Sequence, residues 1–140
     1  MKNLKVGDKI DGNELTVNDY HIFSFAGLTG DYNRLHVDDE FAKNTIYKGR
    51  IGHGLLSLSL GLGLLFHNID GYFLYGFDKI RFLNPVRPGM TIKSELVVNR
   101  IKNKENYTLY YCSLKVIGKN NSEILISEII LGKMKENASS

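Results

Sequence analysis

One segment limits most strongly what this chain folds into: it opens at Gly52-His53-Gly54 and runs to about His67. Large apolar residues cover every side of it when it is drawn as a helix, namely Leu55, Leu56, Leu58, Leu60, Leu62, Leu64, Leu65 and Phe66. A helix that is apolar on all sides must be buried on all sides. The sequence therefore predicts a central helix that the rest of the chain surrounds.

Two glycines inside this predicted helix, Gly61 and Gly63, are unfavourable for helix formation. Each costs about 1 kcal/mol relative to alanine in a helix interior. Such a cost is accepted where something approaches the helix backbone closely. We therefore expect a neighbouring element to pack against the helix at these positions.

Four long segments rich in β-branched and aromatic residues follow the helix and are typical of β-strands. They are residues 72–83, 91–100, 107–117 and 123–131. Turn-forming residues separate them, so the last three are predicted to pair as an antiparallel meander. One buried helix followed by long strands indicates an α+β domain in which an antiparallel sheet wraps around the helix. The open edge of such a sheet is a place for a second subunit.

The first third of the chain has weaker patterns. Residues 6–10 and 14–17 alternate as two short strands, with Asp11-Gly12-Asn13 as a turn between them. Asn18 is suited to cap a helix that begins at Asp19 and ends at Gly30. Residues 31–50 are predicted to be irregular, with a helical turn near residues 38–43.

Length and composition point to one globular domain. The chain has 140 residues, 43% hydrophobic and 24% charged, with a net charge of +3. The basic residues are scattered and form no recognisable nucleic-acid motif, so we expect no nucleic-acid partner. We expect a single domain over residues 1–134 and a flexible tail over residues 135–140, which has no apolar anchor.

The predicted environment is the cytoplasm. The first residues carry no signal-peptide pattern, and the apolar stretch around residues 55–66 is too short to span a membrane. Cys112 is the only cysteine, which excludes an intramolecular disulfide and a cysteine-based metal cluster. We expect Cys112 to be a small core residue.

Asp31, Asn33 and His36 lie within six residues, in a polar segment between the two predicted apolar helices. A carboxylate and an imidazole are the usual pair for proton transfer near neutral pH, because their surroundings tune both pKa values. The same residues also suit a plain loop, with Asp31 and Asn33 as turn formers and His36 in solvent. The spacing alone leaves both interpretations open.

Gly52-His53-Gly54 stands at the start of the central helix, where backbone N–H groups have no helical partner. Glycine lets a ligand approach these amides, which suits an oxyanion that develops during a reaction. The alternative is a glycine hinge that packs against the sheet. His53 is predicted to cap the helix or to pack, rather than to line the site.

Other chemistry-bearing residues form no recognisable site. His21 and His67 have no partner at metal-ligand spacing, so no metal is expected. The chain has no Gly-x-Ser-x-Gly elbow for a serine nucleophile. Gly61-Leu62-Gly63 is not continued as a nucleotide-binding fingerprint.

Three segments in order carry a resemblance to a known family. They are FAGLTGDYNRLH (residues 25–36, with Ala42 downstream), RIGHGLL (residues 50–56) and RFLNPVRPG (residues 81–89). Together they resemble the MaoC-like dehydratases, which include the (R)-specific enoyl-CoA hydratases, over roughly residues 5 to 130. The family pattern has proline where this chain has Arg34, which gives up rigidity and adds a charge.

The resemblance implies a hot-dog fold, with a curved antiparallel sheet around the central helix, and a homodimer. It implies that Asp31 and His36 hold and activate a water molecule and that the Gly54 N–H binds the thioester oxygen. It also implies that Asn33 orients the catalytic loop and that Ser59 braces it. No cofactor is implied, since coenzyme A or the phosphopantetheine of an acyl carrier protein is part of the substrate.

The expected reaction is the addition of water to a trans-2-enoyl thioester, giving an (R)-3-hydroxyacyl thioester, or the reverse dehydration. Two alternatives remain open. Other hot-dog proteins hydrolyse acyl-CoA as thioesterases, and a non-catalytic protein of this fold would only bind acyl thioesters. The retention of both Asp31 and His36 argues against the non-catalytic alternative.

Overall fold

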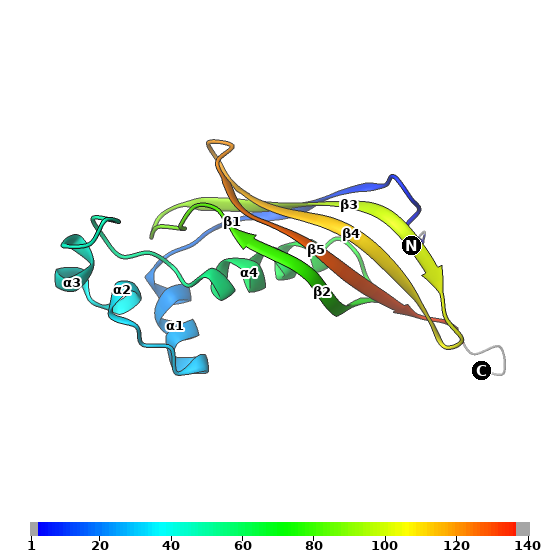
Figure 1. The fold of residues 1–140 in the computed structure, drawn as a ribbon, viewed down its shortest axis with the longest axis horizontal. Coiled ribbons are helices and arrows are strands. Elements are labelled where there is room, and N and C mark those ends of the chain that lie inside the picture. The colour runs from blue at the N-terminus through cyan, green and yellow to red at the C-terminus, as the bar shows by residue number, and fades with distance from the viewer. Residues whose placement is uncertain (1–2, 137–140) are drawn as a thin grey trace.

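A helix lies in the hollow of a curved, five-stranded antiparallel sheet in the computed structural model, which describes residues 3–136 (Figure 1). The helices are α1 (Asp19–Thr29), α2 (Arg34–Val37), α3 (Asp39–Lys43) and α4 (Gly54–Phe66). The strands are β1 (Lys9–Thr16), β2 (Tyr72–Phe82), β3 (Thr91–Asn103), β4 (Tyr107–Gly118) and β5 (Glu123–Met134). The α+β class predicted from the sequence is confirmed.

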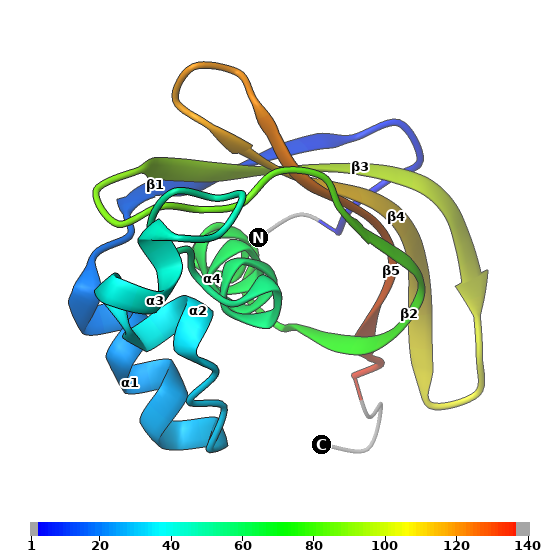
Figure 2. The ribbon, with the colours of Figure 1, turned by 60° about the vertical axis from the view of Figure 1, so that its left-hand side comes forward.

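The sheet has the strand order β1-β3-β4-β5-β2, with every neighbouring pair antiparallel. Strands β3, β4 and β5 form the predicted meander. Figure 2 shows the sheet arching around α4, while α1, α2 and α3 gather beside one end of that helix. Irregular registers interrupt the β1–β3, β2–β5, β3–β4 and β4–β5 pairs. Such bulges bend a strand and increase its twist, which lets the sheet curve around a helix.

The N-terminal strand corrects one prediction. We expected two short strands joined by a turn at Asp11-Gly12-Asn13, but β1 is one strand that pairs with β3 on both sides of a bulge between Asp11 and Glu14. An ideal Cβ on Gly12 would lie 2.1 Å from the Ser94 hydroxyl oxygen and 3.2 Å from backbone atoms of α4. Glycine is thus required by close packing of the strand, and not by a turn.

The central helix is less completely enclosed than its composition predicts. Its buried face includes Leu65, which has no exposed surface, but Leu55 is 58% exposed. Leu55, Ser59 and Gly63 stand four residues apart and form an exposed stripe along α4. The prediction of burial on all sides is therefore wrong for this chain by itself, because the sheet and α1 leave one side of α4 uncovered.

The two glycines of α4 differ in their surroundings. An ideal Cβ on Gly61 would lie 2.4 Å from Cγ2 of Val116 on β4, whereas one on Gly63 meets nothing within 4 Å. The expected close approach is confirmed at Gly61. Gly63, on the exposed stripe, has no such neighbour among the described residues.

The segment before α4 is more regular than predicted. Asn18 caps α1 as expected: its side chain accepts from the Tyr20 N–H at 3.0 Å, and its own N–H donates to His21 Nδ1 at 3.0 Å. The helical turn expected near residues 38–43 is present as α3, but the additional short helix α2 was not predicted. Four residues are too few for a helical hydrophobic period to show.

Near the C-terminus the last strand is longer than predicted. Strand β5 reaches Met134, and the Lys135 N–H donates to the Asn106 carbonyl at 3.0 Å. Of the tail predicted over residues 135–140, residues 137–140 lie outside the described part of the chain. Within residues 3–136, no helix has the length and apolarity needed to span a membrane.

Cys112 is 2% exposed, on β4. Burial raises the pKa of its thiol to about 12. A thiol of this kind is almost entirely protonated at neutral pH and is a poor nucleophile or ligand. The predicted role of Cys112 as a core residue is confirmed.

Candidate active site

The turn after α1 presents the Asp31 carboxylate. Gly30 ends the helix with φ of 80°, a left-handed conformation that glycine adopts without strain. The Asp31 N–H then donates to the Thr29 hydroxyl at 3.2 Å, and Asp31 Oδ1 accepts from the Asn33 N–H at 3.2 Å. These short contacts hold the turn and leave Asp31 exposed to solvent.

His36 follows on α2, a helix that Asn33 caps. The Asn33 side chain accepts from the Leu35 N–H at 3.0 Å, which places His36 one turn later. Nδ1 of His36 lies 2.8 Å from the carbonyl oxygen of Ile51. Because a carbonyl oxygen only accepts, Nδ1 carries the proton in the neutral ring, and Nε2 carries the lone pair. This is the tautomer that a general base requires.

His53 joins the pair from the residue before α4. Its Nε2 lies 3.0 Å from the backbone carbonyl of Asp31, and its ring stacks on that of His36 with 3.9 Å between centroids and an interplanar angle of 28°. Ligand-type side-chain atoms of Asp31, His36 and His53 all lie within 4.8 Å of one another. The structure thus brings the two predicted residues together and adds a third.

The prediction that His53 would cap or pack is only half right. Its side chain makes no capping hydrogen bond to α4. The ring is 3% exposed and packs between His36 and Phe25, whose centroid is 4.9 Å away. Burial lowers the pKa of His53 below its ordinary value, although its hydrogen bond to the Asp31 carbonyl acts in the opposite direction. The net direction of the shift is downward, which favours the neutral form of the ring.

The cluster does not have the arrangement of a metal centre. Imidazole binds a metal through a lone pair in the plane of its ring. The rings of His36 and His53 are stacked with only 28° between their planes, so their in-plane lone pairs do not converge on one point. Nδ1 of His36 and Nε2 of His53 also face backbone carbonyls. The geometry suits proton transfer better than coordination.

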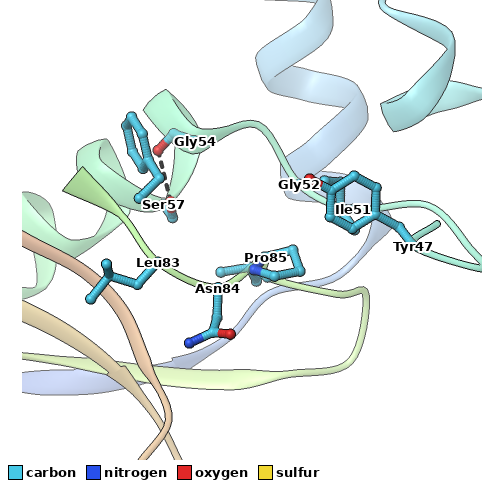
Figure 3. A pocket seen from close by; sticks show the side chains of 10 residues that line it. Tyr47, Ile51, Gly52, Gly54, Ser57, Leu83, Asn84 and Pro85 are labelled. Carbon is cyan, nitrogen blue, oxygen red and sulfur yellow. Dashed lines mark hydrogen bonds between the residues drawn. The ribbon is translucent and has the colours of Figure 1, made fainter. Parts of the chain in front are cut away.

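A cavity of about 290 Å³ opens beside the start of α4 (Figure 3). Its wall is formed by two stretches of chain and by α4, and the residues are Tyr47, Ile51, Gly52, Gly54, Ser57, Phe82, Leu83, Asn84, Pro85 and Val86. Figure 3 shows Leu83, Asn84 and Pro85 across the cavity from Gly52 and Gly54. Asp31 and His36 do not line it. The cavity and the pair are connected at Ile51, which lines the cavity and whose carbonyl oxygen faces His36 Nδ1.

Gly54 is the first residue of α4, so its N–H has no acceptor within the helix. An ideal Cβ on Gly54 would lie 3.0–3.1 Å from ring carbons of Phe82. A side chain at this position would crowd the Phe82 ring, which packs over the helix start. The Ser57 hydroxyl donates to the Gly54 carbonyl at 2.7 Å, which ties this turn together (Figure 3).

Arg50 connects the elements that carry the pair. Its guanidinium donates to Asp39 at 2.6 Å, to Asp19 at 2.8 Å and to the His36 carbonyl at 3.3 Å. The side chain is 9% exposed. Burial lowers the pKa of Arg50, but the hydrogen bonds to the two carboxylates outweigh it and the net shift is upward. Sequence reasoning missed this role, for which the only signal was the position of Arg50 in the second family motif.

Replacing Arg50 with lysine is expected to lower the free energy of unfolding by about 1–2 kcal/mol, measured by urea denaturation. A single ammonium group cannot reach three acceptors in the geometry of a guanidinium. Arg34→Lys is the matched control, because the Arg34–Asp38 pair is 65% and 34% exposed. We expect a change below about 0.5 kcal/mol there. Equal effects in both variants would contradict the proposed role of Arg50.

Arg34, which departs from the family pattern, is engaged locally. Its Nε lies 3.2 Å from Asp38, and its guanidinium lies 4.6 Å from the centre of the Phe41 ring. The Phe41 N–H and the Arg34 side chain lower the pKa of the Asp38 carboxyl. Position 34 is the first residue of α2, where the backbone N–H makes no hydrogen bond within the helix. Proline, which has no N–H, would therefore lose no hydrogen bond at this position. The arginine therefore preserves the backbone that the family proline favours.

Ser59 is the predicted residue that the structure leaves apart from this cluster. It lies on the exposed stripe of α4, and its side chain makes no hydrogen bond to the Asp31–His36 loop within residues 3–136. Its bracing role remains a prediction. Ser57, two residues earlier, lines the cavity instead.

Comparison with known proteins identifies the family of this chain. A family model described as the MaoC like domain matches residues 2–120. The chain belongs to the MaoC-like dehydratase family. An (R)-specific enoyl-CoA hydratase from Rhodospirillum rubrum is 30% identical over 105 residues, which are 74% of this chain and 73% of that protein. Several other curated relatives are matched over less than two thirds of their own length.

Solved structures extend the likeness to the fold. The monoamine oxidase regulatory protein from Archaeoglobus fulgidus superposes with a TM-score of 0.87 at 30% identity, covering 96% of this chain and 93% of that one. The (R)-hydratase from Aeromonas caviae gives a TM-score of 0.79 at 25% identity, covering 94% and 98%. The hot-dog fold implied by the sequence motifs is confirmed. The MaoC-like family comprises hydratases and dehydratases that act on acyl thioesters.

Proposed function

We propose that this MaoC-like chain adds water to the double bond of a trans-2-enoyl thioester to form an (R)-3-hydroxyacyl thioester, or catalyses the reverse dehydration. One observation carries the proposal: Ile51 holds the proton of His36 on Nδ1, so that Nε2 is a base within a cluster that includes the Asp31 carboxylate. The named activity of the relative from Rhodospirillum rubrum supports the same reaction.

The chemistry follows from the thioester, which withdraws electrons from the double bond. A water oxygen bonds to the β-carbon while one of its protons passes to the Asp31–His36 pair. Electron density moves to the thioester oxygen, and a proton then reaches the α-carbon. The sum is one hydroxyl on the β-carbon and one hydrogen on the α-carbon, so no oxidant or reductant is required.

The start of α4 is suited to the charge that develops on the thioester oxygen. The Gly54 N–H has no helical acceptor, and the helix dipole places partial positive charge there. Loss of one such donor in an oxyanion site typically costs about 3–4 kcal/mol in the transition state. The adjoining cavity, with Ile51, Leu83 and Val86 in its wall, offers an apolar surface for part of the substrate.

The test is a spectrophotometric assay with crotonyl-CoA, in which hydration lowers the absorbance of the conjugated thioester. Chiral analysis of the product should give the (R)-3-hydroxy isomer. A panel of acyl chain lengths, each offered as the CoA and as the carrier-protein thioester, identifies the substrate. No absorbance change with any of these substrates would contradict the proposal.

A thioesterase is the second candidate among proteins of this fold. Release of free thiol from a saturated acyl-CoA, faster than hydration of the enoyl-CoA, would favour it. Binding of acyl-CoA without any turnover would favour a non-catalytic binding protein.

Location in the cytoplasm is also part of our proposal, and the single free thiol of Cys112 supports it.

We further propose that two copies associate through β2. Within residues 3–136 this strand pairs with β5 alone, and Tyr75, Phe77 and Phe82 on it are 38–51% exposed. An open strand edge with large apolar residues invites pairing with another chain. Sedimentation equilibrium should give twice the mass of one chain, and Phe77→Lys should shift it towards the monomer. Val6→Lys, at an apolar residue that is 62% exposed and precedes β1, should not. A native monomer would refute the dimer.

A further inference from the structure

His53 is a buried polar side chain of the candidate active site to which the proposed reaction gives no role. It is 3% exposed, and its Nδ1 has no hydrogen-bond partner among the described residues. A buried acceptor without a donor is unfavourable, and most such groups in native proteins are paired. A ring that served only to fill space would cost less as phenylalanine. The position therefore points to a function of the imidazole itself.

The two other features of this ring both concern the catalytic pair. Its Nε2 faces the Asp31 carbonyl at 3.0 Å, and since that oxygen only accepts, Nε2 carries the proton and donates. Its face lies against the His36 ring at 3.9 Å between centroids. One side chain, attached immediately before the α4 start, thus contacts the backbone of one member of the pair and the ring of the other.

We propose that His53 is a positioning residue that holds Asp31 through its Nε2–H and His36 through ring stacking, so that both stay aligned with the Gly54 N–H. The placement on the chain makes this effective, because His53 is the neighbour of Gly54 and moves with it. His36 is held from its edge by Ile51 and from its face by His53. Asp31, which is exposed, has this anchor on its carbonyl.

The charge state of the cluster fits this role. Burial lowers the pKa of His53, the hydrogen bond to the Asp31 carbonyl raises it, and the neighbouring His36 lowers it, with a net downward shift. Because the two ring centroids lie 3.9 Å apart, a positive charge on one ring disfavours a positive charge on the other. The charged groups that face His53 are His36 and Asp31, and Phe25 covers its other side.

Two substitutions separate the two contacts. His53→Gln keeps an N–H donor close to the position of Nε2 but removes the ring. His53→Phe keeps a ring face for His36 but removes the donor. His67→Gln is the control, because His67 is exposed at the opposite end of α4. Circular dichroism and thermal unfolding establish which variants fold, and either folded variant is sufficient for the test.

The inference rests on the proposed hydratase function, and one measurement is chosen to be independent of it. Nitrogen-15 NMR of the histidine rings reports the tautomer and titration of His36 without any substrate. We expect the His36 titration to shift in His53→Gln and to remain near that of the native protein in His67→Gln. An unchanged His36 titration and tautomer in His53→Gln would overturn the proposal, whether or not the protein hydrates crotonyl-CoA.

With crotonyl-CoA as substrate, we expect kcat to fall by roughly 10- to 100-fold in both His53 variants, because small misplacements of catalytic groups have effects of this size. KM should stay within about twofold, since neither contact is made to the substrate. Values of kcat within about twofold of the native enzyme in folded variants would also overturn the proposal. If the native protein hydrates no enoyl thioester while the His36 titration shifts as expected, the proposed reaction fails and the positioning role stands.

Discussion

Loss of either Asp31 or His36 is expected to lower kcat for hydration of crotonyl-CoA by roughly 10²–10⁴-fold, the range that a positioned acid or base contributes. Asp31→Asn keeps the shape of the side chain but removes its charge and basicity. His36→Ala removes the Nε2 lone pair that the Ile51 carbonyl keeps available. The measurement is the initial rate of absorbance loss at saturating substrate, compared at equal concentrations of folded protein.

The double variant sharpens this test. If the two residues act on the same water molecule, combining Asp31→Asn and His36→Ala should cost little more than the worse single change, because catalytic units are not additive. His67→Ala is the matched control for a histidine outside the cluster and should retain the native rate. Near-native rates in both single variants would exclude the pair from the chemistry.

The second large effect concerns stability. Gly61→Ala is expected to lower the free energy of unfolding by roughly 1–3 kcal/mol, as overpacking of a core does. The same substitution in an exposed helix would gain about 1 kcal/mol. The sign is reversed here because the new Cβ would lie 2.4 Å from Cγ2 of Val116, a residue with no exposed surface and therefore little room to move. Urea denaturation measures the difference.

Two further variants locate the cause. The double variant Gly61→Ala/Val116→Ala should lose less stability than the sum of the losses of the two single variants. The reason is that Val116→Ala removes the methyl group with which the new Cβ would collide. Gly63→Ala meets nothing within 4 Å in the chain and should be neutral or stabilising. A loss of stability in Gly63→Ala that changes with protein concentration would instead indicate a second copy packed over the exposed stripe. Unaltered or greater stability of Gly61→Ala would contradict the packing described for α4.

The elements that the sequence predicts well are those in which a long pattern repeats. The 13 residues of α4 and the strands β2 to β5 are long enough for composition and turn residues to identify them. The prediction for the β1 region was wrong because Asp11-Gly12-Asn13 is typical of a turn. Its glycine is instead required by close packing against Ser94 and α4, which are distant in the sequence. Local chemistry does not reveal a contact of that kind.

The residues of the candidate site also fall into those that the sequence predicts and those that it does not. Asp31 and His36 were predicted from residue type, close spacing and the family motif, and Gly54 from the family motif at a helix start. Arg50 and His53 were missed as site residues because their roles depend on partners far away in the chain: Asp19 for Arg50, and the Asp31 carbonyl for His53. A family motif shows that a residue type recurs at a given position, but the contacts of that residue are visible only in the folded chain.

The linear pattern of residues was enough to predict the central helix, the antiparallel meander and the family, and to propose Asp31 and His36 as a pair. These depend on periodicity and short-range order, which a linear pattern contains. Three findings came from the folded chain: one stripe of α4 is uncovered, glycine is required at position 61 and not at position 63, and His36 presents Nε2. Each of these depends on a contact between residues far apart in the chain, and the three-dimensional packing alone brings such residues within 4 Å.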